Sequence, residues 1–153
     1  MTGFFRRLCP ARWNAQAVAL ALMLQAPPSF AQTDPETAQF QRCTGTGRVT
    51  CVVDGDTIWY RGAKIRLADI NAPEVSQPGC ASEAALGERA TRRLTELLNA
   101  APFSLGREGR DLDRYGRMLR VVSRRGASLG GTLEREGLAE HWQGRRGDWC
   151  GAG

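Results

Sequence analysis

Several residue types on which common protein chemistry depends are scarce in this sequence. Its 153 residues include one histidine, His141, and one lysine, Lys64. No two cysteines have the C-x-x-C spacing, and with a single histidine the sequence argues against a zinc site. The apolar stretch at residues 15–24 is shorter than the ~20 residues that a permanent transmembrane helix needs. Internal repeats and low-complexity tracts are also absent.

Residues 1–31 have the organisation of a secretory signal peptide. Three arginines and no acid lie in residues 1–12, the apolar stretch follows, and Ser29-Phe30-Ala31 has a small-x-small pattern. We therefore expect residues 1–31 to be removed during export to the periplasm or the medium, with no membrane attachment afterwards. The alternative is an amphipathic or buried N-terminal helix.

Removal of this segment changes the charge of the chain. The full sequence has 21 basic and 16 acidic residues, a net charge of +5. Without the three arginines of residues 1–31 the balance is 18 against 16, or +2. So small a charge is not typical of a protein that coats nucleic acid, but it suits one that handles a few phosphates at a site.

The cysteines favour disulfides over a metal. Cys9 lies in the signal segment, and an even number of cysteines in an exported chain predicts two disulfides. Four cysteines allow three pairings, which the sequence alone does not decide. We favour Cys43–Cys51, closing a short glycine-rich hairpin, and Cys80–Cys150, tying the far end of the chain to the loop after the expected strand that contains Arg66.

Short β-like runs and two helical segments follow a polar leader, residues 32–45, which we expect to be loose. The helix at 81–99 has apolar residues at helical spacing, with Ser82 as a cap and most charged residues on the other face. The elements expected are strands at 49–53, 57–60, 64–70, 103–105 and 118–122 and helices at 81–99 and 128–136. This order predicts a mainly β domain with α-helices over residues 46–150, a five-stranded OB-fold barrel with two or three packed helices.

Three segments contain candidate functional residues, and each has a plainer reading. Residues 53–57 (Val-Asp-Gly-Asp-Thr) have two acids at a hairpin mouth, although Asp-Gly is also a common turn signal. Arg66 lies within an apolar strand, where a buried guanidinium needs an anionic partner, either a substrate phosphate or a carboxylate such as Glu74 or Asp69. Residues 111–117 end in Tyr-Gly-Arg, with a glycine that permits a tight turn, but such a run is usually a solvated loop.

In combination these segments resemble the staphylococcal nuclease (thermonuclease-like) family over residues 49–138. The resemblance implies an OB-fold barrel and a calcium-dependent nuclease for DNA and/or RNA that leaves 3′-phosphate ends. Arg66 and Arg117 match the arginines that hold the scissile phosphate, and Glu74 matches the residue that activates water. Arg114 and Tyr115 match residues that bind the substrate near its terminal phosphate.

The same resemblance implies a calcium site with one departure. Asp56 matches a calcium-ligand aspartate, and the backbone carbonyl of Ala72 matches a further ligand. The second aspartate of the family falls on Asn71, whose amide oxygen can still bind calcium but lacks a charge. Asp69, two residues earlier on the expected strand, would share a face with Asn71 and could contribute instead.

The tail also departs from the family, because His141, Trp142 and Trp149 occupy it in place of the family's tyrosines. We expect the tryptophans to cover the barrel rather than to stack on a base, and no histidine-based nuclease motif surrounds His141. A monomeric nuclease is therefore the main prediction. A catalytically weak or silent OB-fold module that binds nucleic acid is the alternative, and a purely structural disulfide-linked domain would leave Arg66 unexplained.

Overall fold

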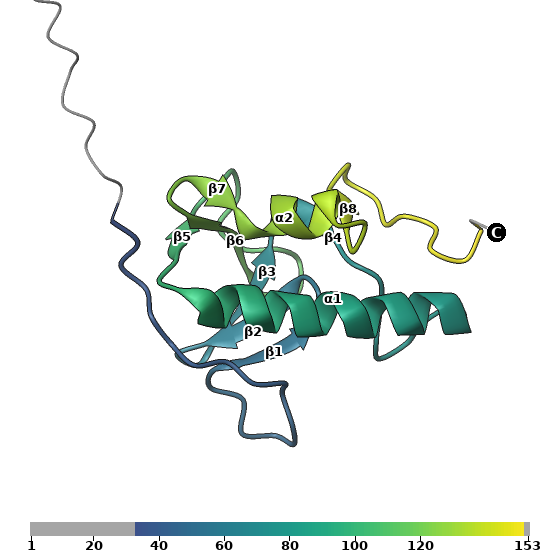
Figure 1. Cartoon of the computed structure of the whole chain (residues 1–153), viewed down its shortest axis with the longest axis horizontal. Helices are drawn as coiled ribbons and strands as arrows, with labels where there is room; N and C mark the ends of the chain where they lie inside the picture. The colour runs from purple at the N-terminus through teal and green to yellow at the C-terminus, as the bar shows by residue number, and fades with distance from the viewer. Residues whose placement is uncertain (1–32, 152–153) are drawn as a thin grey trace, which may run out of the picture. The chain divides into compact units, whose positions relative to one another are not determined.

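The computed structural model describes residues 33–151, so the predicted signal peptide lies outside the described residues. The chain forms a mixed sheet with two helices (Figure 1). No helix in the described part is both long and apolar enough to cross a bilayer. The elements in chain order are β1 Cys51–Asp54, β2 Thr57–Tyr60, β3 Ala63–Leu67, β4 Ile70–Asn71, α1 Ala81–Ala100, β5 Ser104–Gly106, β6 Met118–Arg124, β7 Ala127–Ser128, α2 Leu129–Arg135 and β8 Glu140–His141.

The main sheet has the strand order β1-β2-β3-β6-β5, with β7 paired to β6. β1, β2 and β3 form an antiparallel meander, whereas β6 joins β3 in parallel. The turn between β2 and β3 is formed by Arg61 and Gly62, both with positive φ, which is typical of a two-residue hairpin. The mainly β architecture with two helices is thus confirmed, whereas closure of the sheet into a five-stranded barrel stays a prediction.

The third predicted strand, residues 64–70, is interrupted. β3 ends at Leu67, the chain bends, and β4 pairs with β8 in a separate two-stranded sheet. The N–H of Ala68 still donates to Arg120 O on β6 at 2.9 Å, but the carbonyl of Asp69 accepts from Trp142 N at 2.9 Å. The bend turns the backbone from one pairing partner to another, so alternation of faces cannot be counted through it.

The segment predicted as a loose leader is part of the folded domain. Phe40 is buried, and its ring centroid lies 5.9 Å from those of Tyr60 and Phe103. Backbone hydrogen bonds join Glu36 to Phe103 and residues 41–43 to Val52. One aromatic in a polar run gives no periodic signal, which is why the sequence did not predict this docking.

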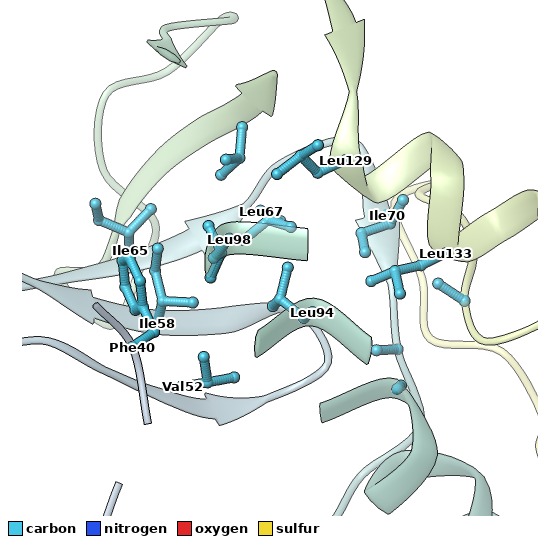
Figure 2. Close-up of a cluster of buried hydrophobic side chains, with 14 of the residues drawn as sticks. Phe40, Val52, Ile58, Ile65, Leu67, Ile70, Leu94, Leu98, Leu129 and Leu133 are labelled. Atoms are coloured by element: carbon cyan, nitrogen blue, oxygen red, sulfur yellow. The ribbon is translucent and has the colours of Figure 1, made fainter. Parts of the chain in front are cut away.

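The hydrophobic core lies between the main sheet and the two helices (Figure 2). Val52, Ile58 and Ile65 contribute from the sheet, and Leu94 and Leu98 contribute from α1. The predicted helical spacing is confirmed, because Ala90, Leu94 and Leu98 are fully buried. Leu129 and Leu133 bring the shorter α2 into the same cluster, beside Ile70 of β4 (Figure 2).

The helix ends differ in how they are capped. Ser128 is the N-cap of α2, and its side chain accepts a hydrogen bond from Gly131 N at 3.0 Å. Gly137 follows the helix with a φ of +68°, as expected of a helix-ending glycine. The expected cap at Ser82 is wrong, because α1 begins after Cys80, which makes no side-chain cap hydrogen bond.

Both disulfides favoured from the sequence are present, Cys43–Cys51 and Cys80–Cys150. The first holds the docked leader beside β1, although Arg42 and Val52 pair in parallel, so the enclosed segment is a loop and not a hairpin. The second spans 70 residues and ties the C-terminal tail to the start of α1. Figure 1 shows the yellow tail running from β8 to that end of the helix.

Candidate active site

A cleft of about 670 Å³ opens at one end of the main sheet. Its walls come from the β1–β2 turn, the end of β4, the loop before β6 and the tail after β8. Charged side chains dominate the lining. They are Asp54, Asp56, Glu74, Glu108 and Asp113 and the arginines at positions 66, 110, 114, 117, 145 and 146.

Arg66 and Asp56 form a buried pair at the floor of this cleft. Arg66 projects from β3, and one of its terminal nitrogens lies 3.3 Å from Asp56 Oδ2. The other terminal nitrogen donates to the carbonyl oxygens of Leu67 and Ile70, the latter at 2.8 Å. The bend after β3 therefore supplies the acceptors that a buried guanidinium requires. Asp56, and not Glu74 or Asp69, is the carboxylate that pairs with Arg66.

Asp56 is itself held by the strands around it. Its Oδ1 accepts from the hydroxyl of Thr57 at 2.9 Å, and its Oδ2 accepts from Ala72 N at 3.1 Å. The second hydrogen bond joins the β1–β2 turn to the end of β4. Asp56 and Ala72, two of the predicted metal ligands, are therefore neighbours in the structure. The backbone amide of Asp56 in turn donates to Asp54 Oδ1 at 3.2 Å.

Asp54 adds a third carboxyl group to the cleft. Burial, together with the negative charges of Asp56 and Glu74, raises the pKa of Asp54 to about 7. A carboxyl group in such surroundings resists ionisation unless a cation lies nearby. The sequence pattern identified Asp54 only as one of two acids at a turn and assigned it no role.

Asn71 and Asp69 are separated by the bend after β3. Asn71 lines the cleft, and its side-chain amide donates to Glu140 Oε1 on β8 at 3.1 Å, which leaves the amide oxygen as its remaining acceptor. Asp69 points elsewhere, because its carboxylate accepts from the hydroxyl of Ser128 at the start of α2. The expectation that Asp69 joins the metal ligands is therefore wrong, since the two residues do not share one regular strand.

Glu74 lies at the rim of the cleft, on the loop after β4. Its backbone N–H donates to Glu83 Oε1 at 3.2 Å, and Glu83 Oε2 accepts from Gly79 N at 2.7 Å. Glu83 is buried although it was expected on the exposed face of the helix. Its spacing from Gly87 and Ala90 on α1 is the signal that would have placed it on the buried face.

The side chain of Glu74 is paired with Arg146 of the C-terminal tail. The distance between Arg146 Nη2 and Glu74 Oε1 is 2.7 Å. Arg146 is largely exposed, whereas the Glu74 side chain is mostly covered. No sequence pattern indicated this contact, because Arg146 lies in an irregular segment far along the chain.

Arg117 is fixed by the loop that precedes β6. Asp113 accepts from the backbone and Nε of Arg117, the latter at 2.6 Å, and from the backbone of Tyr115. These hydrogen bonds from Arg117 and Tyr115 hold the pKa of Asp113 below its ordinary value despite its burial. Gly116 has a φ of +75°, which confirms the tight turn expected there. Within residues 33–151, Nε is the only nitrogen of the Arg117 guanidinium that is hydrogen-bonded, so its terminal nitrogens are available to a ligand in the cleft.

Arg114 and Tyr115, the predicted substrate-binding residues, lie beside Arg117. Arg114 donates to the hydroxyl of Tyr115 at 2.6 Å, and the Tyr115 ring lies 5.5 Å from the Arg117 guanidinium carbon. Tyr115 is 67 % exposed, and the guanidinium carbon of Arg114 also lies over its ring, 4.7 Å from the ring centroid.

Trp142 does not cover the sheet, contrary to the expectation. It is 36 % exposed and lines the cleft, with its ring 4.8 Å from the guanidinium carbon of Arg66. This cation–π contact helps to fix the arginine. His141 is exposed on β8, outside the cleft lining, and Trp149 is half-buried.

Comparisons with known proteins identify relatives of this chain. The protein named uncharacterized endonuclease from Haemophilus influenzae is 33% identical over 99 residues, which cover 61% of this chain and 51% of that protein. Endonuclease YncB from Bacillus subtilis is 38% identical over 92 residues, 57% of this chain and 43% of that protein. The micrococcal nuclease of Shigella flexneri is 39% identical over 80 residues, 50% of this chain and 41% of that protein. The chain thus spans about half or less of the length of these curated relatives.

The sequence model of a single family covers most of the cleft. It is described as staphylococcal nuclease homologue and matches residues 64–148, more than half of the 153-residue chain. The matched range contains Arg66, Glu74 and Arg117 and also the tail that carries Arg146. The chain therefore belongs to the staphylococcal nuclease homologue family.

Proposed function

We propose that this protein is a metal-dependent nuclease that hydrolyses phosphodiester bonds of DNA, RNA or both. The observation that carries the proposal is the convergence of Arg66, Glu74 and Arg117 on one cleft. Family membership and the nuclease names of the relatives support it.

In this proposal the two arginines hold the phosphate. Arg66 and Arg117 are each fixed through part of the guanidinium, by backbone carbonyls and Asp56 in one case and by Asp113 in the other. Their remaining N–H groups can bind the oxygens of a phosphodiester in the geometry that guanidinium groups favour. Donors fixed before the substrate arrives stabilise the charge that develops on the phosphate oxygens in the transition state.

Glu74 is the proposed base that takes a proton from the attacking water. Such a base contributes about 10²–10⁴ to the rate when it lies within hydrogen-bond reach of the water. The buried Glu83 fixes the backbone of Glu74, so the carboxylate projects from a defined point. Because Arg146 holds that carboxylate in the free protein, catalysis requires the two side chains to separate.

The oxygen donors in the cleft suit a calcium ion. Asp54, Asp56, Glu74 and the amide oxygen of Asn71 provide the hard ligands that this cation prefers, and burial together with the neighbouring carboxylates raises the pKa of Asp54. Asp56 and Asn71, with the carbonyl of Ala72, would hold the ion. When bound, calcium would withdraw charge from a phosphate oxygen and lower the repulsion that faces the nucleophile.

The family resemblance extends the proposal to details of product, fold and location. We propose that cleavage leaves 3′-phosphate ends and that the sheet corresponds to the family's OB-fold barrel. We also propose that the protein acts as a monomer in the periplasm or the medium. Two disulfides support an oxidising compartment.

Digestion of single-stranded DNA and RNA with calcium, with magnesium and with a chelator tests the nuclease proposal. Arg66→Ala, Arg117→Ala and Glu74→Gln should each lose at least about a hundredfold in rate. The control is Arg92→Ala, which removes an exposed arginine of α1 outside the cleft and should leave the rate unchanged. Undiminished cleavage by the three cleft variants would refute the mechanism.

Binding without cleavage by the wild-type protein in every metal would favour the alternative, a silent nucleic-acid-binding module. Asn71→Asp tests the metal site separately. The added carboxylate should lower the calcium concentration needed for half-maximal activity, and an unchanged requirement would show that Asn71 is not a ligand.

A further inference from the structure

The C-terminal tail, residues 142–150, forms a strap across the cleft that is fixed at both ends. At its start Trp142 N donates to Asp69 O at 2.9 Å, next to the β4–β8 pair. At its far end the Cys80–Cys150 disulfide ties it to the first turn of α1. Between these anchors Gly144, Arg145 and Arg146 line the cleft.

This strap adds two positive charges to the lining of the cleft. Without the tail, four arginines face five carboxyl groups, those of Asp54, Asp56, Glu74, Glu108 and Asp113. With Arg145 and Arg146 the arginines number six. A cleft with an excess of positive charge attracts a polyanion, so the tail supplies the charge that the rest of the lining lacks.

Arg146 is placed to exchange one anion for another. Its ion pair with Glu74 lies at the surface, with the arginine side chain 69 % exposed, and surface ion pairs of this kind contribute little to stability. The disulfide already holds the tail, so the ion pair is not needed to anchor it. In the described part of the chain Arg145 forms no ion pair at all.

We propose that Arg146, with Arg145 beside it, forms a second phosphate subsite for the nucleic-acid strand, next to the bond that is cut. This inference rests on the proposed nuclease function and names a part of its substrate. In the free protein Arg146 forms an ion pair with Glu74. When a strand binds, Arg146 moves to a neighbouring backbone phosphate, which both adds a contact and leaves Glu74 free to accept a proton from water. The Cys80–Cys150 disulfide keeps Arg146 within reach of both partners.

The subsite predicts a difference between short and long substrates. A small diester with one phosphate, such as p-nitrophenyl thymidine phosphate, occupies only the cutting site. A strand also occupies the subsite. Arg146→Ala should therefore weaken binding of the strand more than binding of the small diester.

The salt dependence of binding measures this contact directly. A fluorescein-labelled oligothymidylate is titrated in chelator at several salt concentrations, with fluorescence anisotropy as the readout. Each phosphate contact of a single strand adds about 0.7 to the slope of log affinity against log salt. We expect the slope to fall by about 0.7 in Arg146→Ala and by about 1.4 in Arg145→Ala/Arg146→Ala. Arg146→Lys should keep the slope, because it keeps the charge.

Two controls separate the subsite from general effects. Arg92→Ala removes one equally basic, exposed residue of α1 outside the cleft and should bind as the wild type does. Cys80→Ser/Cys150→Ser keeps both arginines but frees the tail, and it should lose at least as much slope as Arg146→Ala. Circular dichroism checks that each variant is folded, and Arg146→Ala tests the contact even if the cysteine variant does not fold.

The outcomes distinguish this inference from the proposed function. If the wild type cleaves the strand but Arg146→Ala has the same slope as Arg92→Ala, the subsite is refuted and the nuclease proposal stands. If the wild type hydrolyses neither substrate but Arg146→Ala loses slope, the subsite is supported and the catalytic proposal fails.

Discussion

Gly87 lies in the middle of α1 and faces the loop that carries Glu74. A β-carbon added there would lie 2.8 Å from the carbonyl oxygen of Pro73, 3.0 Å from that of Glu74 and 3.0 Å from Val75 Cγ2. Ordinary contacts begin at 3.4 Å, so the loop would have to move by 0.4 to 0.6 Å. Two of the three atoms belong to the backbone, and no change of rotamer can relieve their overlap.

Gly87→Ala should therefore not gain the stability that the higher helix propensity of alanine would otherwise give. Replacing glycine by alanine within a helix stabilises by about 1 kcal/mol. Forcing a methyl group into a packed position costs about 1–3 kcal/mol, so the net change is a destabilisation of about 0–2 kcal/mol. Gly131→Ala in α2 is the matched control, because its β-carbon would meet nothing closer than 3.6 Å. It should be neutral or more stable by up to about 1 kcal/mol.

Urea unfolding followed by circular dichroism gives the two free energies of unfolding. The variants should differ by about 1–3 kcal/mol, the cost of the overlap. If the protein is a nuclease, the shift of Glu74 should also lower kcat of Gly87→Ala by roughly tenfold, since a misplacement of about 1 Å can cost about a hundredfold. Equal stability of the two variants, with full activity of Gly87→Ala, would refute the close approach of α1 to this loop.

Three further perturbations test other parts of the fold. The folded-state pKa of Asp54, about 7, lies above its ordinary value of 3.8, so the folded protein binds more protons in that interval. In chelator the free energy of unfolding should therefore decrease as pH rises from about 4 to about 7, and an equal decrease in Asp54→Asn would exclude this carboxyl group as its source. Phe40→Ala should destabilise by about 3–5 kcal/mol in urea unfolding, whereas a loss below about 1 kcal/mol would show that the docked leader is not part of the core. Ser128→Ala should lose about 1 kcal/mol of unfolding free energy with its cap, and Ser128→Thr should retain most of it.

The elements that the sequence predicted well are those whose signal is local and periodic. The apolar spacing of α1 and the turn at Gly116 each depend on residues a few positions apart. The pairing Cys43–Cys51 and Cys80–Cys150 was favoured but not decided, because the number of cysteines fixes no connectivity. The sequence predicted the strands in their order along the chain. It did not predict that β6 pairs with β3 in parallel.

The sequence by itself determined the family and the residue types of the cleft, because Arg66, Glu74 and Arg117 lie in motifs with fixed local spacing. Only the tertiary structure decided their partners. The bend after β3 sends Asp69 towards Ser128 while Asn71 remains in the cleft. The tail brings Arg146 to Glu74 across a separation of 72 positions. Contacts between distant segments depend on how whole elements pack and on where a disulfide holds the chain. Periodicity over a few residues predicts neither the packing nor the disulfide pairing.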